Sequence, residues 1–293
     1  MRRGPESATI PRVTMHLWLD GAHDAPHHMA RDAALLERAA AGALPGPVLR
    51  LFAFDPPGIT LGRAQDAGRE LDLERLERAG IRWSHRPTGG RAIWHEEEWT
   101  FSLVTRFEGE GWAASPPAAY ERTARLFARS LARLGVRAEL SPGSPRGAGP
   151  PRSAAGSAPP CFASTARHEL TLGGRKLAGI AQRAVRGALL QQGSVLLGDA
   201  HAKLAHWVRG TSAERAALAS AWRVSAAAAG ESLAGDRSPA RLADALAAEL
   251  AAAGELRRLD GEDGARALRL DESPRPYSRD CLGRVGDYTA RRL

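Results

Sequence analysis

The chain of 293 residues has little cysteine, little lysine and few aromatic side chains. Its two cysteines, Cys161 and Cys281, are too few for a disulfide framework, and neither has the paired spacing of a zinc site. Arg2 and Arg3 precede no apolar run of the kind found in signal peptides, and no stretch is apolar for long enough to cross a membrane. We therefore expect a cytoplasmic protein with reduced cysteines, no metal site and no membrane partner.

What is abundant is arginine, alanine and ordinary apolar residues. Apolar residues make up 43% of the chain and charged residues 25%, as in a globular protein with one large domain and an optional extension. The formal net charge of +8 favours anionic partners. The basic residues are scattered and no nucleic-acid-binding motif accompanies them, so we expect no nucleic acid; an acidic protein partner fits this charge, and so does a plainly solvated surface.

Apolar spacing predicts helices and strands in mixed order. The predicted helices cover residues 27–41, 71–79, 116–134 and 238–253, and the predicted strands cover residues 15–19, 48–54, 59–61, 81–84, 92–94 and 99–105. Further along, turns at Gly173-Gly174 and Arg186-Gly187 predict a three-stranded antiparallel meander over residues 168–172, 175–184 and 188–196. This mixture indicates the α+β class.

The composition also divides the chain. Residues 141–160 are almost entirely Ser, Pro, Gly, Ala and Arg, which predicts a mobile loop because so little apolar surface can be buried. We expect residues 1–26 to hold a flexible N-terminus and the first strand, 27–225 a catalytic domain containing that loop, and 226–293 a helical C-terminal extension.

Three local patterns suggest chemistry. In the first, Arg86, Thr88, Gly89, Gly90, Arg91 and His95 place two adjacent glycines between arginines, where backbone amides and positive charge meet a ligand closely. A hairpin turn between two strands explains the glycines equally well.

The second pattern centres on Lys176, which is followed by the small residues Gly179 and Ala181. Its ammonium group can bind a carbonyl oxygen or an acyl phosphate in a cavity, whereas an exposed strand lysine is the plainer interpretation. The third is Cys161, at the end of the predicted loop. A thiol beside a lysine has a lowered pKa and is a better nucleophile, although an inert cysteine is commoner.

Together these patterns resemble the lipoate–protein ligase and octanoyltransferase family. The resemblance rests on Leu61-Gly62-Arg63-Ala64-Gln65, on the segment from Pro87 to His95, on the segment from Gly174 to Gln182 and on Leu190 to Ser194. It implies a mixed, largely antiparallel sheet with flanking helices, as in biotin and lipoate ligases. It also implies an acyl pocket lined by Arg86, Thr88, Gly89, Gly90 and His95, completed by Gly179, Ala181, Gly193 and Ser194, with Lys176 as the signature lysine.

Within that family, Cys161-Phe162 ahead of Lys176 is similar to the cysteine-dependent transferases of Gram-positive bacteria. That resemblance implies transfer of octanoate from octanoyl-acyl carrier protein, through a Cys161 thioester, to a lysine of a lipoyl domain in a 2-oxoacid dehydrogenase or the glycine cleavage H protein. No cofactor is expected, and the enzyme is expected to be a monomer. Two alternatives stay open: a lipoate or octanoate ligase that uses ATP and Mg²⁺, and a module that binds an acyl carrier or lipoyl domain without turnover.

Overall fold

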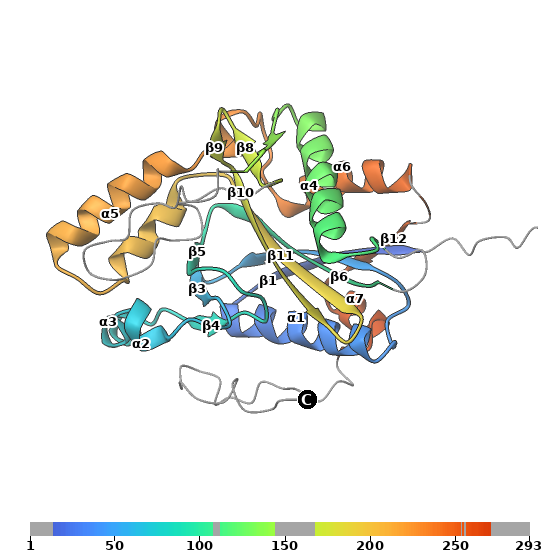
Figure 1. Ribbon diagram of the computed structural model, residues 1–293, viewed down its shortest axis with the longest axis horizontal. Helices are drawn as coiled ribbons and strands as arrows, with labels where there is room; N and C mark the ends of the chain where they lie inside the picture. Colours follow the sequence, from blue (N-terminus) through green and yellow to red (C-terminus); the bar gives the residue numbers. More distant parts are fainter. Residues whose placement is uncertain (1–13, 108–111, 144–167, 253, 255, 271–293) are drawn as a thin grey trace, which may run out of the picture.

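A six-stranded mixed sheet forms the centre of the molecule in the computed structural model (Figure 1). The structure describes residues 14–107, 112–143, 168–252, 254 and 256–270. The predicted flexible N-terminus, most of the predicted mobile loop, Cys161 and Cys281 therefore lie outside the described residues. The sheet has the order β10-β11-β6-β2-β1-β12, and its strands are β1 (Met15–His23), β2 (Val48–Phe54), β6 (Glu98–Arg106), β10 (Ala178–Val185), β11 (Ala188–Leu196) and β12 (Leu256–Asp260).

Strand direction confirms the predicted class. β10, β11, β6 and β2 pair antiparallel in turn, whereas β1 pairs parallel to both β2 and β12. The sheet is thus mixed and mostly antiparallel, with helices on both faces (Figure 1). α4 (Pro116–Arg133) and α6 (Pro239–Ala251) cover one face, and α1 (Ala25–Ala40) and α7 (Gly261–Ala267) cover the other.

Local signals explain where the long helices begin. The carboxylate of Asp24 accepts a hydrogen bond from the backbone N–H of His27 at the start of α1, and the hydroxyl of Ser115 caps α4 in the same way. A proline in the first turn of α1, α4 and α6 gives up no helical hydrogen bond there. Gly42, with a φ of +70°, follows the end of α1 and confirms the predicted stop.

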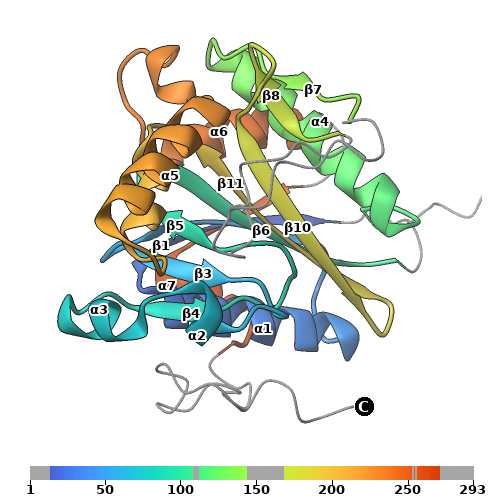
Figure 2. The same ribbon diagram turned by 60° about the vertical axis from the view of Figure 1, so that its left-hand side comes forward.

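A second, three-stranded sheet lies beside the first (Figure 2). Its order is β4-β3-β5, formed by β3 (Gly58–Leu61), β4 (Trp83–His85) and β5 (Ile93–His95). The helix predicted over residues 71–79 is confirmed as α3 (Leu73–Arg78), and a further short helix, α2 (Ala67–Glu70), precedes it. They pack on this sheet with a 3-10 helix (Ala200–His206) and α5 (Ser212–Ser225), around an apolar cluster that includes Leu61, Leu71 and Trp222.

The predicted three-stranded meander is wrong at one point. The strand predicted over residues 175–184 divides at Leu177 into β9 (Arg175–Lys176) and β10. β9 pairs with β8 (Leu170–Leu172), which pairs with β7 (Glu139–Leu140), and these three form a separate small sheet. The backbone N–H of Leu177 donates to Leu170 while its carbonyl accepts from Leu196, so this residue joins both sheets.

The segment after residue 225 contains helices, as expected, and also a strand that was not predicted. β12 extends the central sheet beside β1, and the indole N–H of Trp18 donates to the carbonyl of Gly261 at the start of α7. The central sheet therefore runs across both expected segment boundaries, near residues 26 and 226, because β1 and β12 are its strands.

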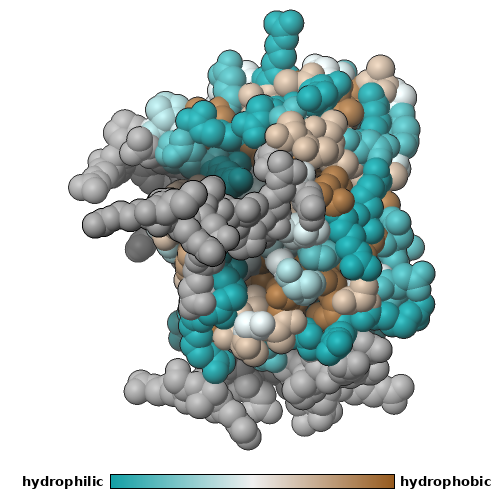
Figure 3. All heavy atoms as spheres, turned by 90° about the vertical axis from the view of Figure 1, so that its right-hand side faces the viewer, coloured by the Kyte–Doolittle hydropathy of each residue, from teal (hydrophilic) through white to brown (hydrophobic). Residues whose placement is uncertain are grey.

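The described part of the chain exposes few large hydrophobic side chains. Val224 is the large hydrophobic residue that stands out as exposed among the described residues. On the face drawn in Figure 3, hydrophilic side chains surround small hydrophobic patches. No helix in the described part of the chain combines the length and the hydropathy needed to span a membrane.

Candidate active site

A pocket lies between the central sheet and the small β4-β3-β5 sheet. Both sheets, the N-terminal half of α1 and the loop after β4 contribute to its lining: Met29, Phe52, Phe54, Thr60, Arg86, Ile93, His95, Thr100, Gly179, Ala181, Gln192, Gly193 and Ser194. Aromatic and aliphatic side chains thus alternate with imidazole, hydroxyl and amide groups. A mixed lining of this kind is typical of a ligand pocket.

Arg86 organises the Gly89-Gly90 loop from within. Its buried guanidinium group donates from Nε to the carbonyl of Gly89 at 3.0 Å and from Nη2 to the carbonyl of Arg91 at 2.7 Å. Nη1 reaches the carbonyl and the hydroxyl of Thr60, each at 3.3 Å. The predicted hairpin is wrong, since β4 and β5 both pair with β3 and the loop between them crosses that strand.

Close backbone approaches explain two of the glycines. A Cβ atom at Gly62 would lie 2.0 Å from the carbonyl oxygen of Gly90, so the early Leu61-Gly62 segment passes directly against the Gly-Gly loop. A Cβ atom at Gly193 would lie 2.5 Å from the Phe101 ring and 2.9 Å from the carbonyl oxygen of Gly179. A side chain at Gly193 therefore displaces the pocket wall, and a side chain at Gly62 displaces the Gly-Gly loop behind it.

His95 belongs to a hydrogen-bonded chain in the wall. Its Nδ1 lies 2.6 Å from Oε1 of Glu98, and its Nε2 lies 2.7 Å from the hydroxyl of Thr60. Since a carboxylate accepts, Nδ1 carries the proton and Nε2 accepts from Thr60. The ring also stacks on Phe54, with the centroids 3.9 Å apart. Orientation and tautomer of the imidazole are thus both determined by its neighbours.

Thr88 sits behind the pocket. Its hydroxyl donates to Oε1 of Gln192 at 2.7 Å, and Nε2 of Gln192 donates to Oδ2 of Asp32 at 2.6 Å and contacts the sulfur of Met29 at 3.4 Å. Thr88 therefore joins the Gly-Gly loop to β11 and α1.

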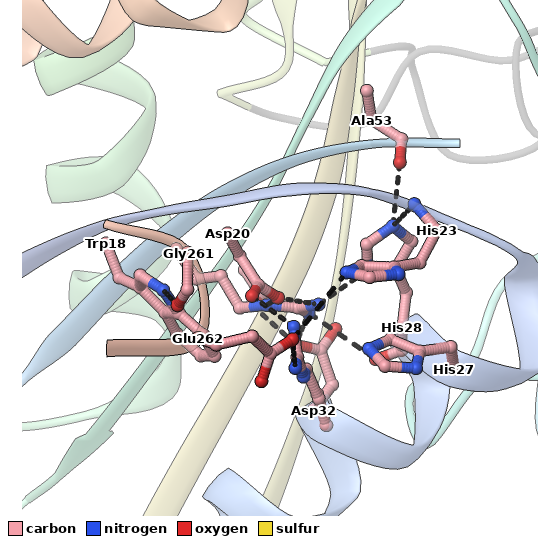
Figure 4. A network of polar contacts seen from close by, with 12 residues as sticks. Trp18, Asp20, His23, His27, His28, Asp32, Ala53, Gly261 and Glu262 are labelled. Atoms are coloured by element: carbon pink, nitrogen blue, oxygen red, sulfur yellow. Dashed lines mark hydrogen bonds and ion pairs between the residues drawn. The ribbon is translucent and has the colours of Figure 1, made fainter. Parts of the chain in front are cut away.

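This connection continues into a buried charge network (Figure 4). Arg50, fully buried in β2, donates to Asp32 at 2.6 Å and to Asp20 at 2.6 Å, and its Nη2 lies 2.6 Å from Nδ1 of His28. Arg31 pairs with both Asp20 and Glu262. Burial and the Arg50 charge lower the pKa of His28, while burial raises the pKa of Asp20 despite the nearby arginines.

His23, His27 and Glu262 bring their ligand atoms within 4.8 Å of one another at the edge of this network. A cation is already present there, because the guanidinium group of Arg31 binds the Glu262 carboxylate. Burial, Arg31 and His23 lower the pKa of His27 to about 4. His23, His27 and Glu262 therefore belong to the ion-pair network of Arg31.

Lys176 lies outside the pocket lining, in β9. Only 3% of its side chain is exposed, and its Nζ donates to Oε1 of Glu169 at 2.6 Å, so the interpretation as an exposed strand lysine is wrong. The carbonyl of Lys176 accepts from the backbone N–H of Ala227. β10 begins two residues after Lys176, at Ala178, and contains Gly179, which does line the pocket.

The structure brings together a large part of the predicted binding set. Arg86, His95, Gly179, Ala181, Gly193 and Ser194 all line the pocket. Thr88, Gly89, Gly90 and Arg91 do not line it, and they hold the loop behind Arg86 instead. Seven lining residues were not predicted, and they come from strands and a helix far apart in the chain: Met29, Phe52, Phe54, Thr60, Ile93, Thr100 and Gln192.

Solved structures share this architecture. The bipartite lipoate protein ligase of Thermoplasma acidophilum superposes with a TM-score of 0.65 at 18% identity, covering 88% of this chain and 91% of that one. A lipoate-protein ligase A bound with ATP also superposes with a TM-score of 0.65, at 19% identity over 92% and 99% of the two chains. The fold is therefore the α+β fold of lipoate ligases, with a pocket between its two sheets.

Sequence comparison identifies the family to which this fold belongs. Residues 24–251 match the model of the lipoyl protein ligase A/B catalytic domain, and the chain belongs to that family. The octanoyltransferase LipM of Kyrpidia tusciae is 38% identical over 184 residues, which are 63% of this chain and 66% of that protein. LipM of Moorella thermoacetica is 37% identical over 64% of this chain and 67% of its own length. The chain thus spans about two thirds, or slightly less, of these relatives.

Proposed function

We propose that the protein is an acyltransferase that moves an octanoyl group from octanoyl-acyl carrier protein to a lysine of a lipoyl-domain protein, in the synthesis of protein-bound lipoate. The observation that carries this proposal is the pocket between the two sheets, in a chain of the lipoyl ligase A/B family. The similarity to two proteins named octanoyltransferase supports the choice of reaction.

The proposed reaction has two thioester steps and uses Cys161 as the nucleophile. The Cys161 thiolate attacks the octanoyl carbonyl, a new C–S bond forms, and the carrier leaves as its thiolate and takes up a proton. The lysine amine of the acceptor then attacks this thioester, the C–N bond forms while the C–S bond to Cys161 breaks, and the leaving Cys161 thiolate takes up the proton lost by the nitrogen. Because the acyl group arrives activated, the proposed reaction needs neither ATP nor a cofactor.

Lys176 is proposed as the residue that stabilises negative charge on the carbonyl oxygen. An ammonium group has three donors, and the one directed at Glu169 holds the side chain in place within a buried environment. A fixed positive charge at low solvent exposure stabilises a developing oxyanion more strongly than a mobile surface lysine does.

The proposed partners are acidic. A net charge of +8 favours encounter with an acidic carrier protein and an acidic lipoyl domain, and this attraction weakens with salt. One of the structural neighbours is described together with its E2 lipoyl domain as parts of a lipoylation system, which supports a lipoyl domain as the acceptor class. We propose that a monomer works in the cytoplasm, with its catalytic and pocket residues between 27 and 225 and with residues 226–293 as an extension that adds β12 to the central sheet.

One assay tests the proposal and its main alternative. Octanoyl-acyl carrier protein, and separately octanoate with ATP and Mg²⁺, are offered with a lipoyl domain to the wild type and to Cys161→Ala. We expect transfer from the carrier only, its loss in the variant, and an octanoyl adduct on Cys161 by mass spectrometry. Transfer from free octanoate that survives Cys161→Ala would establish the ligase instead, and binding of the lipoyl domain without transfer would establish the non-catalytic module.

A further inference from the structure

The polar side chains of the pocket wall share one property, which is the direction of their hydrogen bonds. Oε1 of Glu98 receives three donors from the wall: Nδ1–H of His95 at 2.6 Å, the hydroxyl of Thr100 at 2.6 Å and the hydroxyl of Ser194 at 2.9 Å. Glu98 itself does not line the pocket, and only 3% of its side chain is exposed. The carboxylate therefore lies behind the wall and draws three donors away from the cavity.

The other polar groups of the wall also direct their hydrogen bonds into the protein, away from the cavity. The hydroxyl of Thr60 donates to Nε2 of His95, and both hydrogens of the Gln192 amide are used by Asp32 and Met29. Each nitrogen of Arg86 donates to backbone or hydroxyl oxygen. Among the described residues, these side-chain donors of the wall thus bond to other protein groups.

We propose that Glu98 is a specificity-determining positioning residue that makes this polar wall suitable for an unsubstituted alkyl chain. With its donors occupied, a wall of His95, Thr60, Thr100 and Ser194 needs no hydrogen bond from the ligand, so a methylene chain leaves no donor unsatisfied. A chain bearing a hydrogen-bond acceptor finds no donor and loses its hydration without compensation. A chain bearing a hydroxyl can donate to the wall oxygens and is tolerated.

This inference rests on the proposed function in one respect, since it takes the acyl chain to occupy this pocket. It deepens that function by naming the substrate class: saturated, unsubstituted medium chains are accepted, and chains with a keto group in the buried part are rejected. The recognition does not depend on Cys161 or on turnover, so it can be tested by binding alone.

The test uses three uncharged, unreactive ligands of one length: octanamide, 7-hydroxyoctanamide and 7-oxooctanamide. Binding of each to the full chain is measured by calorimetry for the wild type, Glu98→Gln and Glu97→Gln, the last being an exposed neighbouring carboxylate. We expect the wild type to bind octanamide roughly tenfold or more tightly than the ketone, the effect of one buried unsatisfied carbonyl, with the alcohol between them.

Glu98→Gln places an N–H donor behind the wall. Its amide oxygen is also a weaker acceptor than the carboxylate for His95, Thr100 and Ser194. We expect the ratio of octanamide to ketone affinity to fall at least about fivefold in this variant and to stay unchanged in Glu97→Gln. Equal binding of the three ligands by the wild type, or a ratio unaltered by Glu98→Gln, would overturn the inference. If Glu98→Gln fails to fold, the affinities of the wild type for the three ligands still show whether the wall discriminates against the ketone.

The outcomes separate this inference from the proposed function. If the wild type binds octanamide and the ketone equally well, Glu98 has no role in specificity, and the proposed octanoyl transfer is unaffected. Absence of octanamide binding, in an enzyme that transfers octanoate, shows that the chain binds elsewhere and overturns the inference alone. Absence of both binding and transfer removes the proposed function as well.

Discussion

The two faces of the central sheet differ in chemistry beside the pocket, although each face also contains a buried apolar cluster. Along β6, Trp99, Phe101 and Leu103 point to α4 and α6 and join an apolar core. The alternate residues Thr100 and Ser102 face the other way, where Thr100 reaches Glu98 and Ser102 reaches Asp32. Both faces are buried, so burial alone does not distinguish them. The difference shows that one strand supplies stability on one side and a preorganised polar site on the other.

The largest expected effect comes from breaking the charge network of the polar face. Arg50→Met leaves Asp32 and Asp20 buried without their main cationic partner, and we expect a loss of about 3–5 kcal/mol in unfolding free energy. Denaturant titration measures it. The control is Arg129→Met, which removes a pair between an exposed arginine and Glu249, for which about 0–1 kcal/mol is expected. Equal losses in the two variants would contradict the role given to the network.

A cavity on the apolar face should lower stability and leave the pocket intact. Leu103→Ala removes a side chain packed in the core on the α4 side, which costs about 2–4 kcal/mol. Octanamide affinity of the folded fraction should match that of the wild type, because Leu103 does not line the pocket. A tenfold loss of affinity would show that the two faces are not independent.

The third prediction concerns the place where the two faces touch. Gly193→Ala puts a methyl group against both the Phe101 ring and the Gly179 carbonyl, one on the apolar side and one in the pocket wall. We expect a loss of about 1–3 kcal/mol in unfolding free energy together with weaker octanamide binding. Gly173→Ala is not a matched control because Gly173 has φ +56°, whereas Gly89→Ala meets nothing within 4 Å and should change stability little.

The smallest expected effect is a pH dependence of the polar face. The folded-state pKa of His27 is lowered to about 4, and that of His28 is also lowered, chiefly by burial. Below about pH 6.5, where an unfolded histidine gains a proton, the unfolded chain binds more protons than the folded one, so stability falls as the pH drops from 6.5 toward 4. His27→Gln should lose less melting temperature between pH 7 and pH 5 than the wild type. An identical loss in both proteins would show that His27 does not contribute.

Local pattern was sufficient for much of the fold and for part of the site. The apolar spacing of the sequence predicted α1, α4 and α6 within a few residues, together with β2, β6 and β11. Leu177 shows the limit: its apolar neighbours favour one continuous strand, but hydrogen bonds to Leu170 and Leu196 divide the strand between two sheets. Similarly, β12 has the exposed arginines Arg257 and Arg258 and forms a strand because β1 offers it an open edge.

The sequence by itself determined the α+β class, the family resemblance and the residues of the Gly-Gly loop, because these depend on composition, periodicity and short motifs. Only the tertiary structure decided that Arg86 is occupied by backbone carbonyls, that Lys176 is paired with Glu169, and that Glu98 and Asp32 lie behind the pocket. Each of these is a hydrogen bond whose partner, distance and direction depend on how distant strands are brought together. A sequence motif identifies the donor residue, whereas the tertiary structure determines which acceptor it meets.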